Sequence, residues 1–325
     1  MTDFVMIKEA QRRLEKHSNF TPLLNSPFLD KIAGKRIHLK AECLQKTGSF
    51  KFRGAWSFIS NLTEEERKGG VIAFSSGNHA QGVSAAAKAF GSPCIIVMPK
   101  DAPEVKINNT RNYGAEVVLY DRNKEVREDI GLDIAKKKNL KLIHPYEEPL
   151  VIAGQGTAGL EIAQQVQYKG ITNADVLVCC GGGGLISGIA LALNELNQNL
   201  KARPVEPENF DDTKKSLEQG KIVTNKNVSG SICDAILTPQ PGENTFKIIK
   251  KLCKAGLAVS EEQVLKAIAL AFLHLKVILE PGGAVALAAA LFLPHLIETE
   301  QVIVVGTGGN IDREIFRKAL TFLDV

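Results

Sequence analysis

Short runs of β-branched and apolar residues alternate with longer amphipathic segments, and this alternation limits the fold more than any other feature of the chain. The predicted strands cover residues 36–40, 70–74, 93–98, 116–120, 142–144, 176–180 and 302–305. Several are apolar nearly throughout, which is typical of strands buried on both faces of a parallel sheet. Helical patterns are predicted at residues 80–90, 124–138, 156–168, 186–195 and 261–279. The sequence therefore predicts an α/β fold with largely parallel sheets.

The length of 325 residues suggests two domains, at about 100–200 residues per domain. Distinctive motifs occur early, in the middle and near the end of the chain. If they serve one site, that site lies in a cleft between two α/β lobes. We expect residues 65–147 to form a small lobe, inserted into a large one made of residues 1–64 and 148–325. Residues 204–212 are rich in Pro, Glu, Asn and Asp and are predicted to form a surface loop.

Charge and cysteine usage disfavour several classes of protein. The 40 basic residues nearly balance the 36 acidic ones, and the longest basic run is three lysines at 136–138, so we expect no nucleic-acid binding. The 6 cysteines form no CxxC pair, which argues against a zinc ribbon or a redox motif and favours small buried side chains. Residues 1–16 predict an amphipathic helix, not a signal peptide, and no apolar run is long enough for a membrane span. We expect a cytoplasmic protein.

Four consecutive glycines follow the apolar strand at 176–180 and precede a helical pattern. Glycine lets backbone N–H groups approach a phosphate closely, and the N-terminus of the next helix adds partial positive charge. The loop matches neither the nucleotide-triphosphate P-loop nor the dinucleotide fingerprint. The alternative is a tight turn between strand and helix. We interpret the loop as a phosphate site made of Gly181, Gly182, Gly183, Gly184 and Leu185.

Two further loops follow predicted strands in the same way. Residues 75–79 (Ser-Ser-Gly-Asn-His) carry hydroxyl, amide and N–H groups that suit a carboxylate or a phosphate, although Ser and Asn are also common helix caps. Residues 306–310 (Gly-Thr-Gly-Gly-Asn) lie where α/β sheets bind ligands, and form either a second anion site or a turn.

Lys51 lies between Phe50 and Phe52, with glycines nearby. A lone lysine is normally a solvated surface charge. In an apolar pocket, however, its amine is neutral often enough to form a Schiff base with a carbonyl compound. The local sequence leaves both interpretations open.

Together with two other motifs, these motifs occur along the chain in an order that resembles that of a known enzyme family. They are Thr-Gly-Ser-Phe-Lys-Phe-Arg-Gly-Ala at 47–55, then residues 75–79, Ala-Gly-Gln-Gly-Thr at 153–157, residues 181–185 and residues 306–310. From about residue 7 to about residue 323, the chain resembles fold-type II pyridoxal-phosphate enzymes of the serine racemase and catabolic serine/threonine dehydratase group. The resemblance implies the two-lobed architecture of the tryptophan synthase β family, and an amino acid as substrate.

The resemblance assigns the cofactor to particular residues. Lys51 would hold pyridoxal 5′-phosphate as a Schiff base and act as a base on one face of the substrate Cα. Phe50, or its neighbour Phe52, would flank the ring. Asn78 would hydrogen-bond the ring hydroxyl, and the glycine loop with the Leu185 N–H would bind the phosphate.

Two hydroxyl groups bear on the chemistry that the resemblance implies. Thr307 would meet the pyridine nitrogen, and a hydroxyl there leaves this nitrogen mostly unprotonated, which favours elimination of a leaving group. Ser76 would face the side of the Cα opposite Lys51, and racemisation needs a proton donor on each face. The alternative is that Ser76 binds a carboxylate or caps a helix. Racemases and 3-hydroxyaspartate dehydratases share this serine, so it does not separate them.

The resemblance also implies a substrate site, at Ser75, Ser76, His79, Arg127 and Glu280. Arg127 would reach a second carboxylate of the substrate, or else pair with neighbouring acids on an exposed helix. The chain departs from the family at Ala235, where relatives commonly have glycine. The added methyl group leaves substrate size and rate open.

Effector and metal sites are implied too. Glu206, Phe210 and Asp212 resemble the family's divalent-metal loop, in which two carboxylates and a backbone carbonyl suit Mg²⁺, Ca²⁺ or Mn²⁺; the alternative is a bare acidic loop. A homodimer is also expected. The match to the ATP effector site of some racemase-like relatives is partial and rests on Lys46, Lys106 and Asn310.

The expected reaction is dehydration of L-serine, L-threonine or another 3-hydroxy amino acid to a 2-oxo acid and ammonia, with serine racemisation as a second outcome. The alternatives are a racemase of serine or aspartate and an L-threo-3-hydroxyaspartate ammonia-lyase. A β-replacement synthase is disfavoured by the four-glycine loop, and an inactive ligand sensor by the intact Lys51. We expect no C-terminal regulatory domain, which disfavours the feedback-inhibited threonine deaminase.

Overall fold

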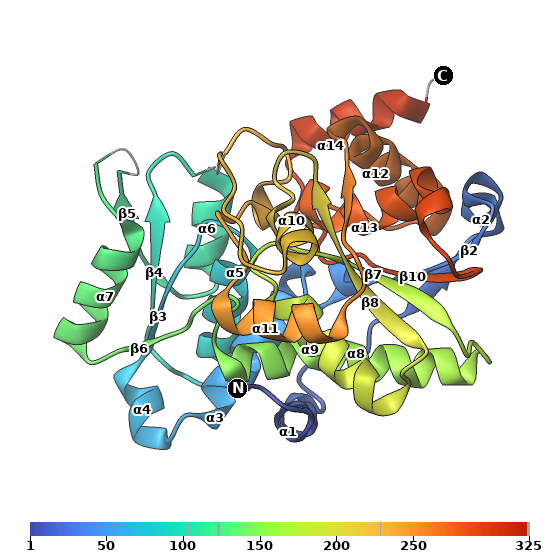
Figure 1. The fold of residues 1–325 in the computed structure, drawn as a ribbon. Helices are drawn as coiled ribbons and strands as arrows, with labels where there is room; N and C mark the ends of the chain where they lie inside the picture. The colour runs from blue at the N-terminus through green and yellow to red at the C-terminus, as the bar shows by residue number, and fades with distance from the viewer. Residues whose placement is uncertain (103, 122–123, 228, 324–325) are drawn as a thin grey trace.

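A computed structural model of the protein describes residues 1–102, 104–121, 124–227 and 229–323. Figure 1 shows two sheets, each with helices around it. The larger sheet has the strand order β1-β2-β10-β7-β8-β9, and the smaller has the order β5-β4-β3-β6. The α/β prediction with mostly parallel sheets is confirmed.

The larger sheet collects strands from both ends of the chain. Only β1 runs antiparallel, against β2, and the other neighbours are parallel. Its central strands are buried almost throughout, because helices pack on both faces. The strands are β1 (Leu23–Asn25), β2 (Arg36–Lys40), β7 (Ala174–Cys179), β8 (Leu200–Pro207), β9 (Leu257–Val259) and β10 (Gln301–Val305).

The smaller sheet is parallel at every pair. Its core strands are wholly buried, whereas β5 at the edge is partly exposed. All four strands fall within residues 65–147, the predicted inserted lobe, whose boundaries remain a prediction. The strands are β3 (Val71–Phe74), β4 (Cys94–Pro99), β5 (Glu116–Tyr120) and β6 (Lys141–Leu142).

The helices complete the two layers around each sheet (Figure 1). Helix α13 is buried from Pro281 to Leu291 because it packs against both the larger sheet and α12. The helices are α1 (Phe4–Leu14), α2 (Pro27–Ala33), α3 (Lys51–Asn61), α4 (Glu64–Gly69), α5 (Asn78–Ala89), α6 (Glu104–Asn112), α7 (Arg127–Lys138), α8 (Pro149–Tyr168), α9 (Gly184–Leu196), α10 (Asp212–Gln219), α11 (Glu243–Leu252), α12 (Glu261–Leu275), α13 (Pro281–Phe292) and α14 (Arg313–Leu320).

Helices α3, α8 and α9 touch through their backbones at glycines. A Cβ at Gly154 would lie 2.4 Å from the Arg53 carbonyl oxygen. A Cβ at Gly188 would lie 2.5 Å from the Ile152 carbonyl oxygen and 2.6 Å from the Gly156 nitrogen. The glycines of the 153–157 motif therefore serve the packing of three helices.

Arg53 anchors the first turn of α3 through a buried cluster of charges. Its guanidinium donates to both carboxylate oxygens of Glu42, at 2.8 Å each, and to those of Glu161, at 2.7 and 2.9 Å. Lys40 is the second cation and contacts Glu161 at 2.5 Å. Two cations and two carboxylates balance, so the buried cluster carries no net charge.

One sequence prediction about the fold was wrong. Residues 204–212 were predicted to be a surface loop, but residues 204–207 are the end of strand β8, which is buried between β7 and β9. Pro204 misled the prediction, because proline lacks an N–H and is uncommon in a central strand. The chain turns only afterwards, at Asn209, whose φ is 69°, before α10 begins.

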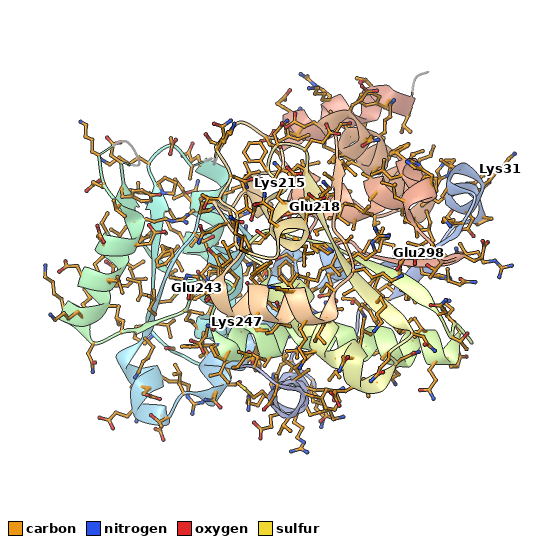
Figure 2. The ribbon with its side chains drawn as sticks, in the orientation of Figure 1. Lys31, Lys215, Glu218, Glu243, Lys247 and Glu298 are labelled. Atoms are coloured by element: carbon orange, nitrogen blue, oxygen red, sulfur yellow. The ribbon has the colours of Figure 1, made fainter. Side chains whose placement is uncertain are left out.

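Two other predictions about the fold, the N-terminal helix and the buried cysteines, are confirmed. The N-terminal amphipathic helix is α1, which buries Ile7, Ala10 and Leu14. Five of the six cysteines are buried, and Cys253 is partly buried. Among the described residues, no helix is both long enough and apolar enough to cross a membrane. Figure 2 shows charged side chains on the outer surfaces of α10 and α11, including Lys215, Glu218, Glu243 and Lys247.

Candidate active site

A cavity of about 180 Å³ lies where the loops after β3, β7 and β10 meet the start of α3. This is the carboxyl end of parallel strands, where α/β sheets bind ligands. All the residues predicted for cofactor and substrate line this one cavity, although they come from six separate parts of the chain. They are Phe50, Lys51, Ser75, Ser76, Asn78, His79, Arg127, Gly181, Gly182, Gly183, Gly184, Leu185, Glu280 and Thr307.

Lys51 is the first residue of α3, and its side chain turns into the cavity. Its Nζ donates to the Pro145 carbonyl oxygen at 3.1 Å and lies 5.1 Å from the centre of the Phe50 ring. Burial lowers the pKa of Lys51 to about 8. Phe52, the other candidate for the ring contact, packs instead in the core against Trp56. At pH 7 this pKa leaves about a tenth of the amine neutral, far more than for a solvated lysine, and the neutral form is the nucleophile.

The glycine loop connects β7 to α9, whose first residue is Gly184. Gly183 has a φ of 89°, a conformation that glycine adopts without strain. A Cβ at Gly182 would lie 2.3 Å from Cγ of Tyr146, and a Cβ at Gly184 would lie 2.8 Å from Oε1 of Gln155. Two side chains thus occupy the space that these glycines leave open.

Residues 75–79 form the loop between β3 and α5. Ser75 Oγ accepts the Gly77 N–H at 3.2 Å. His79 is buried and its Nε2 donates to the Ile143 carbonyl oxygen at 3.0 Å, while no described group meets its Nδ1. Burial, and secondly the charge of Lys51, lower the pKa of His79 to about 3. His79 is therefore a neutral imidazole with a free acceptor nitrogen.

Asn78 is held by hydrogen bonds on both sides of its amide. Its Nδ2 donates to Glu280 Oε1 at 2.5 Å, and its Oδ1 accepts from Asn310 Nδ2 at 2.7 Å. Burial raises the pKa of Glu280 to about 7. The amide keeps one spare donor hydrogen and one spare lone pair for a ligand, in a fixed orientation.

Thr307 follows β10 and is almost fully buried at the cavity wall. Its carbonyl oxygen accepts the Phe50 N–H at 3.2 Å, so the loop is tied to the residue before Lys51. Its hydroxyl lies beside the thiol of Cys179, whose Sγ also contacts the Val305 carbonyl oxygen at 3.4 Å.

The position of Arg127 is compatible with both of the interpretations that its sequence allowed. It lines the cavity, and its guanidinium lies 5.5 Å from the centre of the Phe74 ring. It also donates to Glu128 Oε1 at 2.7 Å, and its side chain is 47% exposed. The charge is thus near the cavity but remains solvated.

Sequence reasoning missed Tyr146 and Gln155, which both line the cavity. Tyr146 packs at 4.8 Å, edge to face, on His144, and burial raises the pKa of its phenol. The signal for Tyr146 was its place just after the predicted strand at 142–144, at the ligand-binding end of a parallel sheet. Gln155 lies within a motif that was noted only for its order in the chain.

The residues proposed for a metal lie apart from this cavity. Glu206 accepts the N–H groups of Thr213 and Lys214 at 2.9 and 2.8 Å, and Asp212 Oδ1 accepts from Asn225 Nδ2 at 2.5 Å. Burial, and secondly the charge of Asp212, raise the pKa of Glu206, and burial raises that of Asp212 to about 7. Within the described part of the chain, no group of three or more His, Cys, Asp and Glu side chains is arranged to hold a metal ion. Phe210, the third residue proposed for the metal, is buried.

A second cavity, of about 510 Å³, adjoins the first at Asn310. Of the three residues in the partial ATP match, only Asn310 lines it. Lys106 lines the first cavity and pairs with Asp234 at 2.7 Å, whereas Lys46 lies 5.5 Å from the centre of the Phe52 ring. The remaining lining is Thr47, Gly48, Gln81, Asn109, Asn112 and Tyr113.

Residues 14–308 match the family described as pyridoxal-phosphate dependent enzyme. The chain belongs to this family. The chain is 41% identical to an L-threo-3-hydroxyaspartate ammonia-lyase from Pseudomonas sp, over 96% of each chain. It is 43% identical to an L-threonine ammonia-lyase from Thermotoga maritima, over 94% of this chain and 75% of that one. The structure of serine racemase from Dictyostelium discoideum superposes with a TM-score of 0.89, at 40% identity, over 96% of this chain and 99% of that one.

The residues of the cavity fit the cofactor of this family. Lys51 supplies a buried amine with a lowered pKa, as Schiff-base chemistry requires. The glycine loop opens the N-terminus of α9, which suits a phosphate. Gln155 adds a buried amide without a protein partner among the described residues. Thr307 places a hydroxyl, not a carboxylate, in the same wall.

Proposed function

We propose that this enzyme is an ammonia-lyase that dehydrates L-serine, L-threonine or a related 3-hydroxy amino acid to a 2-oxo acid and ammonia. The observation that carries the proposal is the buried amine of Lys51, which shares one cavity with the hydroxyls of Ser75 and Ser76. Relatives named for hydroxyaspartate and threonine ammonia-lyase activity support it. A solved relative named serine racemase supports racemisation as a second outcome.

The roles of the residues follow from their chemistry. When bound, pyridoxal phosphate supplies an electron sink for negative charge on the substrate Cα. Lys51 holds the cofactor and, once its amine is free, takes the Cα proton, which a pKa of about 8 permits near neutral pH. Asn78 would orient the ring hydroxyl of the bound cofactor, and Thr307 would meet its ring nitrogen. Ser75 and the neutral His79 bind the substrate beside Glu280.

Racemisation in this proposal needs a second proton donor, and Ser76 is the residue that we assign. Lys51→Ala should abolish the visible absorbance of the lysine-bound cofactor and both activities. Ser76→Ala should remove D-serine formation while 2-oxo acid formation persists. Equal loss of both products in Ser76→Ala would contradict its role as second base. If Lys51→Ala keeps both the absorbance and the activity, the proposed function as a whole is contradicted.

Among the 3-hydroxy amino acids, the favoured alternative to serine and threonine is L-threo-3-hydroxyaspartate, which has a second carboxylate. Arg127 lines the cavity with a guanidinium that is only partly engaged by Glu128. A panel of serine, threonine and L-threo-3-hydroxyaspartate, scored for 2-oxo acid, tests this. Arg127→Gln should raise the KM for hydroxyaspartate alone. Equal effects on all three substrates would show that Arg127 serves the fold and not the second carboxylate.

We also propose a divalent cation at Glu206, Asp212 and the carbonyl of Phe210, with a structural role. Two buried carboxylates with raised pKa values lie beside one another, and Asp212 Oδ2 has no partner among the described residues. A hard cation such as Mg²⁺, Ca²⁺ or Mn²⁺ would satisfy both. EDTA should lower the melting temperature, and Mg²⁺ or Ca²⁺ should restore it.

Three further properties belong to the same proposal. A nucleotide such as ATP would act as an effector in the second cavity, at Asn310. Two copies would pair through apolar side chains of α2 and α12, where Phe28 is 64% exposed and stacks on His274 at 5.1 Å. Light scattering of wild type and Phe28→Glu tests the dimer. We propose a cytoplasmic location, in keeping with free cysteines that are mostly buried.

A further inference from the structure

Gln155 is a buried amide that the protein itself leaves without hydrogen bonds. It lies on α8, is 1% exposed, and lines the active-site cavity. Neither its Nε2 nor its Oε1 has a partner among the described residues. Buried side-chain amides are almost always hydrogen-bonded, because leaving them unpaired loses the bonds that they make to water. Its place in the cavity points to a bound ligand as the missing partner.

The surroundings of the amide locate this partner within the cavity. A Cβ at Gly184, the first residue of α9, would lie 2.8 Å from Gln155 Oε1. A Cβ at Gly54, in the first turn of α3, would lie 3.2 Å from Nε2. The amide therefore lies between the glycine loop and the helix that begins with Lys51. This is the end of the cavity at which we expect the cofactor phosphate.

We propose that Gln155 is a phosphate-binding residue: with its side-chain amide turned over, so that Nε2 takes the place of Oε1 beside Gly184, it donates a hydrogen bond to the cofactor phosphate held by the glycine loop. Backbone N–H groups and the N-terminus of α9 supply the rest of the cradle. A neutral amide suits this place because it adds a donor without adding a buried positive charge next to Lys51, whose amine must stay easy to deprotonate. The inference rests on the family's cofactor and extends its site by one residue.

The variant Gln155→Leu tests the proposal, because it keeps the volume and removes the hydrogen bonds. The matched control is Gln167→Leu, the same change at an exposed position of the same helix. Each protein is stripped of cofactor, its melting temperature is measured, and it is titrated with pyridoxal phosphate and with pyridoxal, which lacks the phosphate. Gln155→Glu, which places a carboxylate beside the phosphate, is the second variant.

A phosphate-binding role predicts effects of opposite sign on stability and on affinity. Cofactor-free Gln155→Leu should melt at or above the wild-type temperature, because it loses an unsatisfied polar group. Its Kd for pyridoxal phosphate should rise about tenfold or more, the effect of one hydrogen bond to a charged group. Its Kd for pyridoxal should stay at the wild-type value. Gln155→Glu should bind pyridoxal phosphate more weakly still, and Gln167→Leu should match the wild type.

Two results would overturn the proposal. Unchanged affinity for pyridoxal phosphate in Gln155→Leu and Gln155→Glu would mean that the amide meets only water. Equal weakening toward pyridoxal and pyridoxal phosphate would mean that Gln155 shapes the cavity without contacting the phosphate. If Gln155→Leu does not fold, Gln155→Met and Gln155→Glu carry the same comparison. A wild type that binds the cofactor but forms no 2-oxo acid would instead sink the proposed function and leave this inference standing.

Discussion

A methyl group at residue 188 should push α8 and α9 apart and disturb the cofactor site that they support. The Cβ of Gly188→Ala would lie 2.5 Å from the Ile152 carbonyl oxygen and 2.6 Å from the Gly156 nitrogen. Ordinary contacts begin at 3.4 Å, so the helices must separate by about 0.9 Å. Both obstacles are backbone atoms, so no side-chain rotation relieves the clash. Overpacking of this kind costs about 3 kcal/mol, of which the better helix propensity of alanine recovers about 1.

The net destabilisation of about 2 kcal/mol should lower the melting temperature by about 3 °C in a chain of this length. Because α9 begins with the phosphate loop, the same shift should raise the Kd for pyridoxal phosphate by about tenfold. Thermal unfolding and cofactor titration measure the two effects. Gly69→Ala is the control, since its Cβ would meet only the Asn139 carbonyl oxygen, at 3.5 Å. A Gly188→Ala protein with wild-type stability and affinity would refute the packing argument.

Three further predictions concern buried ionisable side chains. Arg53→Met should destabilise the fold by about 3–5 kcal/mol because it leaves buried carboxylates unpaired, and adding Glu42→Gln should recover part of this in a double-mutant cycle by urea unfolding. Because the pKa of His79 is lowered on folding, its contribution to the free energy of unfolding is complete above pH 6.5 and falls at lower pH, by up to about 1.4 kcal/mol per pH unit. His79→Gln should lose this dependence of the free energy of unfolding on pH. An unchanged dependence would contradict the assignment of the lowered pKa to His79. Mg²⁺ or Ca²⁺ should raise the melting temperature of wild type but not of Asp212→Asn, and an equal rise in both would remove Asp212 from the metal site.

The strands were predictable where an apolar run alone decides the structure. Strands β2 (Arg36–Lys40) and β5 (Glu116–Tyr120) lie at the predicted residues. The prediction failed where a residue has a local preference that packing overrides. Pro204 disfavours a central strand, yet β8 is held between β7 and β9. Helix α8 begins at Pro149, seven residues before the predicted start, and the glycines of the 153–157 motif lie inside it, where they serve helix contacts.

The site divides in the same way. Lys51 could be assigned only through the family resemblance, since its local sequence also allowed a surface charge. The phosphate loop was predictable from its own residues, because four glycines between a strand and a helix suit a phosphate. Tyr146 and Gln155 were not, because their roles depend on glycines some 30 to 40 positions further along the chain. No local pattern encodes an amide whose neighbours are the first turns of two different helices. The roles that we assign to the cavity residues remain predictions for the experiments above.

The contact between Tyr146 and the loop at Gly182 also bears on how this family diverges. The aromatic ring fills the volume that any side chain at 182 would need. We therefore expect a larger residue at 182 to be acceptable in this chain only after the ring at 146 has been removed. In this protein, the glycine at 182 in the phosphate loop is thus also explained by the space that the Tyr146 ring occupies.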